Sequence, residues 1–187
     1  MAATISYDYT TEKRLWPDRT WSTSVGGSPV FKADTFQSLD HQISYFWKAY
    51  GTSNAMFIAM PGKGAAYFGA EADSAGNRLE GERSYHVHVP ANVPVLNYWS
   101  FVVYDAETRS LLENGQRFPS ISSNDNLKTN PDGSADLYFG PRPPTAAHAN
   151  WIKTIPGHSW FGGFRLFSPT QEFFDRKWEP GNLERLD

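Results

Sequence analysis

From residue 65 onward, the chain is a succession of short runs rich in β-branched and aromatic residues, with turn-forming residues between them. Runs of this length and spacing predict paired strands rather than a helical bundle. The runs are AAYFGAEA (65–72), YHVHV (85–89), YWSFVVY (98–104), LLENGQRF (111–118), SADLYFG (134–140) and FGGFRLFS (161–168). The turn sequence NPDGS leads directly into one of them. We therefore expect a mainly β protein, an antiparallel β-sandwich of the jelly-roll kind.

One amphipathic helix is expected before these strands, over Thr35–Tyr50. Asp34 and Gln37 have capping-box spacing, and Gly51 is a natural stop. Large apolar side chains recur at helical spacing and predict a stripe that packs against a core, formed by Phe36, Leu39, Ile43, Phe46, Trp47 and Tyr50. His41 lies off the centre of this stripe, so we expect it at a solvated rim.

The domain organisation is expected to be simple. Residues 34–187 are predicted to form a single β-sandwich domain, and residues 1–33 an irregular arm that mixes aromatic and turn residues. Trp16 and Trp21 in this arm are expected to pack on the body of the domain or on another subunit, because exposed tryptophan is unfavourable in water.

Charge and composition exclude several classes of function. The formal net charge is −3 and the basic residues are scattered, so neither nucleic acid nor an anionic membrane is an expected partner. The chain has no cysteine, which excludes disulfides and thiol chemistry. It also lacks an apolar N-terminal signal core and any long apolar run, so we expect a cytoplasmic protein without a membrane span.

The stretch SYHVHVP places His86 and His88 on one face of a strand, about 7 Å apart by strand rise. Two histidines on one strand face can supply two ligands of a metal site. A metal site needs further ligands, however, and no carboxylate follows in the sequence until Asp105. The alternative is a strand whose histidine face is polar and outward while Tyr85, Val87 and Val89 face the core. We favour the outward face and keep metal binding by the histidine pair as an alternative.

Six motifs occur in an order that resembles the family called domain of unknown function 1214. They are YWSFVVYD, LLENGQRF, NPDGSADLYF, ANWIKTIPG, FRLFSP and KWEPGNLERL, and the resemblance covers residues 45–187. It implies a jelly-roll-like β-sandwich and no established activity. The positions that match the family motifs are Trp99, Tyr104, Asn114, Arg117, Asp132, Gly133, Asn150, Trp151, Arg165 and Trp178.

Aromatic residues make up 16% of the chain, more than a small core ordinarily needs. Aromatic side chains with a few polar groups line small-molecule sites, and they are also enriched at protein interfaces. Our lead hypothesis is a β-sandwich that binds an apolar or aromatic small molecule in an aromatic-lined pocket, with no cofactor. The candidate ligand-binding residues are Trp99, Tyr67, Asn114 and Trp151.

The hypothesis extends to metal-free acid–base chemistry in the pocket, for which three residues are candidates. His88 is the candidate proton-transfer group, because imidazole ordinarily titrates near neutral pH. Arg117 would anchor a negative group of the substrate, and Tyr104 would donate a hydrogen bond. For Arg117 alone, however, we favour a structural ion pair with a buried carboxylate such as Asp105 or Asp132 over the binding of a substrate anion.

Two alternatives come from other classes of protein. One is a non-catalytic homo-oligomeric assembly module, in which exposed tryptophans of residues 1–33 and edge strands are buried against a second copy. The other is a metal-dependent jelly-roll enzyme that uses His86 and His88 as ligands.

Overall fold

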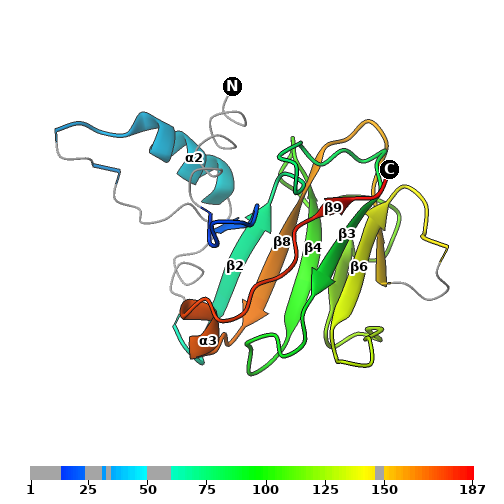
Figure 1. The fold of residues 1–187 in the computed structure, drawn as a ribbon. Helices are drawn as coiled ribbons and strands as arrows, with labels where there is room; N and C mark the ends of the chain where they lie inside the picture. Colours follow the sequence, from blue (N-terminus) through cyan, green and yellow to red (C-terminus); the bar gives the residue numbers. More distant parts are fainter. Residues whose placement is uncertain (1–13, 24–30, 33–34, 50–59, 146–149) are drawn as a thin grey trace.

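The computed structural model describes residues 14–23, 31–32, 35–49, 60–145 and 150–187. Within these residues, two β-sheets lie face to face (Figure 1). The five-stranded sheet has the order β1 (Ser22–Thr23), β2 (Ala65–Ala70), β8 (Trp160–Phe167), β4 (Trp99–Asp105) and β5 (Ser120–Ser122). The four-stranded sheet has the order β7 (Asn150–Lys153), β6 (Ala135–Gly140), β3 (Tyr85–Val89) and β9 (Glu184–Arg185). The predicted mainly β sandwich is confirmed.

The core lies between the two sheets and is built by the alternation of side chains along each strand. Phe101 of β4 and Val87 of β3 are completely buried. Across the sandwich, the ring of Phe101 packs on that of Phe139 of β6, with centroids 4.8 Å apart. Because successive strand residues point to opposite faces, Tyr104 of β4 and His88 of β3 project from the outer faces of two different sheets.

Two details of the sandwich differ from the expected pattern. The run 111–118 forms no strand; it pairs with β4 only through an isolated bridge between Leu111 and Tyr104 and then turns. The turn follows from Asn114 and Gly115, since Gly115 adopts a φ of 82° that glycine tolerates best. In addition, β7 runs parallel to β6, so the sandwich is antiparallel in every pairing but this one.

The helix is shorter than predicted and is oriented differently. α2 spans Leu39–Ala49, and the predicted cap Asp34 lies outside the described residues. Leu39 and Phe46 are 65% and 68% exposed, whereas His41 is only 9% exposed and packs edge-to-face on Phe31. The expected orientation was therefore wrong, because helical periodicity identifies an apolar face without identifying what covers it. Within the described residues, no helix is long and apolar enough to cross a membrane.

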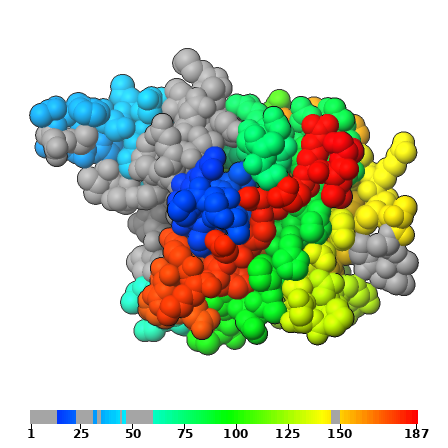
Figure 2. All heavy atoms as spheres, viewed as in Figure 1, coloured from blue at the N-terminus to red at the C-terminus, as the bar shows by residue number. Residues whose placement is uncertain are grey.

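Residues 14–23 pack on the body of the domain, which is one of the two placements expected for this arm. Trp16 and Trp21 are 3% and 0% exposed, and Trp21 packs against aromatic rings of β2, β4 and β8. The indole Nε1 of Trp21 donates to the carbonyl of Gly181 at 2.9 Å. Figure 2 shows this segment in blue against the red and orange C-terminal segment, which includes α3 (Gln171–Phe174). The premise that these tryptophans are exposed for assembly was wrong.

Candidate functional site

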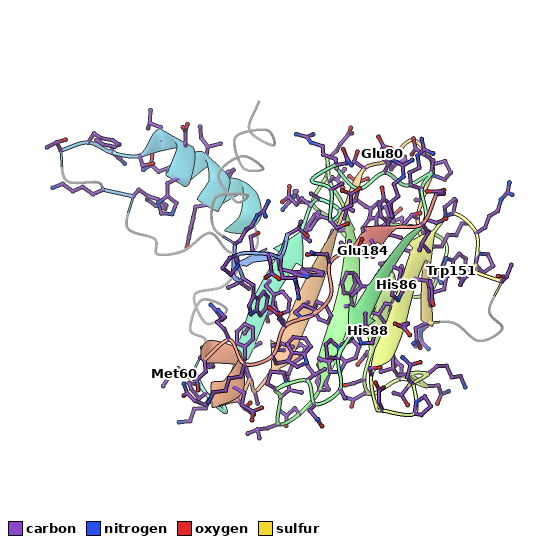
Figure 3. All side chains as sticks on the ribbon, in the orientation of Figure 1. Met60, Glu80, His86, His88, Trp151 and Glu184 are labelled. Atoms are coloured by element: carbon purple, nitrogen blue, oxygen red, sulfur yellow. The ribbon has the colours of Figure 1, made fainter. Side chains whose placement is uncertain are left out.

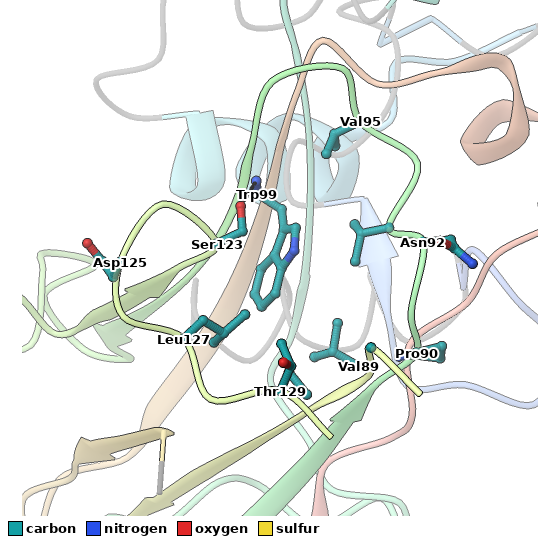
Figure 4. A pocket seen from close by; sticks show the side chains of 12 residues that line it. Val89, Pro90, Asn92, Val95, Trp99, Ser123, Asp125, Leu127 and Thr129 are labelled. Carbon is teal, nitrogen blue, oxygen red and sulfur yellow. Dashed lines mark hydrogen bonds between the residues drawn. The ribbon is translucent and has the colours of Figure 1, made fainter. Parts of the chain in front are cut away.

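A cavity of about 360 Å³ opens at one end of the sandwich, where β3 ends and β4 and β6 begin. Figure 4 shows the ring of Trp99 at its centre, with Val89 and Leu127 on its sides. The other lining residues are Pro90, Asn92, Val93, Val95, Ser123, Asp125, Thr129, Gly133 and Ala135. Two loops therefore form the cavity, one between β3 and β4 and the other between β5 and β6.

The walls of the cavity combine apolar and polar side chains. Trp99 is 5% exposed. Its backbone N–H donates a hydrogen bond to Ser123 Oγ at 3.1 Å, which holds the residue in position. Asp125 is exposed and its Oδ2 accepts a hydrogen bond from the backbone N–H of Ser122. Of the four predicted ligand-binding residues, only Trp99 lines this cavity. The lining combines aliphatic and polar side chains with one aromatic residue, so this cavity does not have the expected aromatic lining.

A second polar cluster lies on the outer face of the four-stranded sheet. His86 Nε2 and His88 Nδ1 each lie 2.9 Å from Asp136 Oδ1, in the neighbouring strand β6. The register explains the geometry, because His88 is directly opposite Asp136. Asn130 donates to the other carboxylate oxygen at 2.8 Å. Figure 3 shows the two histidines side by side, with Glu184 of β9 next to them.

Electrostatics keep Asp136 ionised. Partial burial raises the pKa of its carboxyl group, but hydrogen bonds from Asn130, His88 and His86 outweigh burial and lower the pKa to about 2. An ionised carboxylate only accepts hydrogen bonds, so the ring nitrogens that face it carry protons. In a neutral His88, Nε2 is then left as an unprotonated acceptor, which is the arrangement of a general base oriented by a carboxylate.

Asp136 is the residue that sequence reasoning missed. The search for a partner of the histidines followed the chain beyond His88, whereas the carboxylate comes from a strand 48 residues away. The signal that was present is the alternation in SADLYFG, which places Asp136 and Tyr138 on one face. The described residues contain no group of three or more His, Cys, Asp or Glu side chains arranged to hold a metal ion.

A third cluster lies on the outer face of the five-stranded sheet, where two of the predicted residues come together. Tyr67 of β2 is opposite Arg165 of β8 in the strand register. The Arg165 guanidinium donates to the hydroxyl oxygen of Tyr104 of β4. Burial raises the pKa of Tyr67, and the positive charge of Arg165 opposes that rise.

Three other predicted residues have structural contacts. Asn114 is buried, and its amide donates to the carbonyl of Lys153 at 2.7 Å, which ties the 111–118 loop to β7. The Trp151 indole donates to the carbonyl of Gly140 at 3.1 Å. Arg117 is exposed, with its guanidinium 5.4 Å from the centre of the Phe118 ring.

Arg117 forms no ion pair in the described part of the chain, so the structural pair expected for it was wrong. Asp105 accepts instead from the backbone of Glu107 and Thr108 and contacts His158. Asp132 accepts from Ser134. The structure also does not bring His88 and Tyr104 together, since they lie on the outer faces of different sheets.

The sandwich thus has a cavity at one end and polar clusters on both outer faces. The family model described as "Protein of unknown function (DUF1214)" matches residues 64–171. The chain belongs to this family, which confirms the resemblance found in its motifs.

Two solved structures are similar to the chain. The VPA0106 protein from Vibrio parahaemolyticus matches with a TM-score of 0.60 and 18% identity, over 79% of this chain and 35% of that protein. The chain thus spans about a third of the Vibrio protein. A putative uncharacterized protein from Burkholderia cenocepacia matches with a TM-score of 0.47 and 14% identity, over 100% of this chain and 41% of that protein. No curated protein matches the chain. At this identity, the likeness to the Vibrio protein shows the fold alone.

Proposed function

We propose that the protein binds a small, mainly apolar molecule in the cavity beside Trp99. The observation that carries this proposal is the cavity itself, whose volume of about 360 Å³ lies within the usual range of small-molecule sites. Aliphatic side chains around one large ring form the apolar part of its walls, which can contact the apolar surface of a ligand.

Polar groups near the cavity narrow the class of ligand. Ser123, Thr129 and Asn92 offer hydrogen bonds, while Asp125 contributes a negative charge. A neutral ligand with one polar substituent satisfies both features, because an anionic ligand would be repelled by Asp125.

Filling the cavity from Thr129 should weaken the binding of a ligand. We expect Thr129→Trp to weaken the binding of fluorobenzene about tenfold or more, because the larger side chain occupies the space; a fully enclosed apolar cavity of about 150 Å³ is enough for benzene. The measurement is a titration of fluorobenzene followed by ¹⁹F NMR line width. Asn126→Trp is the matched control, since Asn126 is exposed in the same loop and does not line the cavity. Equal affinity in the wild-type protein and Thr129→Trp would refute this use of the cavity.

The geometry of Asp136 favours a second candidate function, in which His88 transfers protons. The carboxylate orients the imidazole through Nδ1 and leaves Nε2 exposed to an incoming substrate. His88 is 46% exposed at its side chain, so its ring is accessible. This chemistry is separate from the cavity, because Val89 and Ala135 line the cavity while His88 and Asp136 project from the opposite side of the same strands.

The tautomers of the two histidines provide a direct test. We expect neutral His88 to carry its proton on Nδ1 and neutral His86 on Nε2, because each of these nitrogens faces Asp136. Long-range ¹H–¹⁵N correlation spectra at mildly alkaline pH report the tautomer of each ring. In Asp136→Asn, the preference of His88 should relax towards the mixture of tautomers found in free histidine. A dominant Nε2–H tautomer of His88 in the wild-type protein would contradict the proposal.

A further inference from the structure

We propose that the outer face of the five-stranded sheet carries a second site, which binds an aromatic carboxylate through Arg165, Tyr67 and Tyr104. This site is independent of the cavity, because its side chains project from the opposite side of the sheet to the core. Phe164 and Leu166 are completely buried and face the core. Arg165 and Phe167 alternate with them along β8 and therefore lie on the outer face.

Arg165 has unused capacity for an anion. A guanidinium offers five N–H donors. Within the described residues, Arg165 donates one hydrogen bond, to the Tyr104 hydroxyl. No carboxylate of the described residues forms an ion pair with Arg165, whereas Arg109 nearby is paired with Glu71. A half-buried arginine without an acidic partner favours a carboxylate ligand, which matches the planar fork in two parallel hydrogen bonds.

The tyrosines complete the polar part of the site. In the strand register Tyr104 is opposite Phe161, four residues along β8 from Arg165, but its ring reaches across Gly163: a Cβ added at Gly163 would lie 3.3 Å from the Tyr104 ring. Glycine at this position therefore allows Tyr104 to lie along the sheet towards the guanidinium. Tyr67 lies beside Arg165 in the strand register. Its raised pKa keeps the phenol protonated, so that it remains a hydrogen-bond donor.

Aromatic rings on both sides of Arg165 favour an aromatic rather than an aliphatic acid. Tyr98 and Phe167 stack with centroids 4.2 Å apart on one side. Tyr104 and Phe161 stack at 4.9 Å on the other side. A flat aromatic ligand with its carboxylate at Arg165 gains contact with the edge or face of either pair, which an isolated anion such as phosphate does not.

Calorimetric titration with benzoate tests the site. We expect saturable binding to the wild-type protein, and about tenfold weaker binding to Arg165→Met, because the bidentate charge-assisted contact is lost. Arg165→Lys should also bind less tightly than the wild type, since lysine keeps the charge without the planar fork. Arg142→Met is the matched control, because Arg142 is an exposed arginine in the loop after β6.

The probes distinguish the proposed ligand class from the alternatives. Benzoate should bind more tightly than both cyclohexanecarboxylate and inorganic phosphate, and Thr129→Trp should leave its affinity unchanged. Circular dichroism of each variant checks that the sandwich is folded. If Arg165→Met does not fold, Arg165→Lys provides the comparison of benzoate affinity. The proposal is overturned if benzoate shows no saturable binding, if phosphate binds more tightly than benzoate, or if the folded Arg165 variants bind benzoate as the wild type does.

Discussion

Replacing Trp21 with alanine is expected to destabilise the fold by about 3–5 kcal/mol, the usual range for deleting a buried tryptophan side chain. Trp21 is completely buried, and its ring meets those of Phe68, Phe101 and Phe164 at centroid distances of 5.6, 6.1 and 5.5 Å. The substitution also removes the indole hydrogen bond to Gly181, which leaves that carbonyl without this donor. Urea unfolding of the two proteins at equal pH gives the difference in free energy.

Phe36→Ala is the matched control for Trp21→Ala. Phe36 is also an aromatic residue that precedes the family-matched region, but it is 64% exposed. Its removal should therefore change the free energy of unfolding by less than about 0.5 kcal/mol. A cost of under about 1 kcal/mol for Trp21→Ala would mean that residues 14–23 do not belong to the core in solution.

The substitution Gly81→Ala is expected to cost about 3 kcal/mol or more, at the upper end of overpacking effects. A Cβ at residue 81 would lie 1.9 Å from the carbonyl oxygen of Ile155 and 2.7 Å from that of His158. Both contacts are with backbone atoms, so no side-chain rotation relieves them. The Gly81 carbonyl also accepts from Thr154 Oγ1 at 2.6 Å, and a shift of the backbone would strain this bond. Thermal unfolding followed by circular dichroism measures the effect.

Gly157→Ala separates the steric cost at Gly81 from the conformational cost of losing a glycine. Gly157 is in the facing loop, has a φ of 82°, and has open space where a Cβ would be. Alanine there should cost only about 1–2 kcal/mol, the penalty of a left-handed backbone for an L-residue. Equal losses in the two variants would show that crowding at Ile155 is not what requires glycine at position 81.

Local patterns were sufficient to predict the class of fold. The strands β3, β4, β6 and β8 were predicted within about two residues of their ends, because alternation and turn residues are properties of neighbouring positions. The same patterns failed for the run 111–118, which was predicted as a strand. This run turns at Gly115, whose φ of 82° lies outside the strand region, and the Asn114 amide bonds to Lys153 on another strand.

The candidate sites depended on contacts that local patterns do not encode. Trp99 was predicted to bind ligand, yet its cavity exists only because the loops after β3 and β5 meet over it. Tyr67, Tyr104 and Arg117 were candidate site residues, and the fold places Arg165 rather than Arg117 beside the two tyrosines. Periodicity determines which face of a strand a residue occupies, and the pairing of distant strands determines its neighbours.

The sequence by itself thus determined that this chain is a β-sandwich whose histidines project outward from β3. Only the tertiary structure decided that Asp136 holds both imidazoles and that Trp21, 160 residues from Gly181, completes the core. The physical reason is that strand alternation is set by neighbouring residues, whereas register and packing come from minimising exposed apolar area and unpaired polar groups over the whole chain.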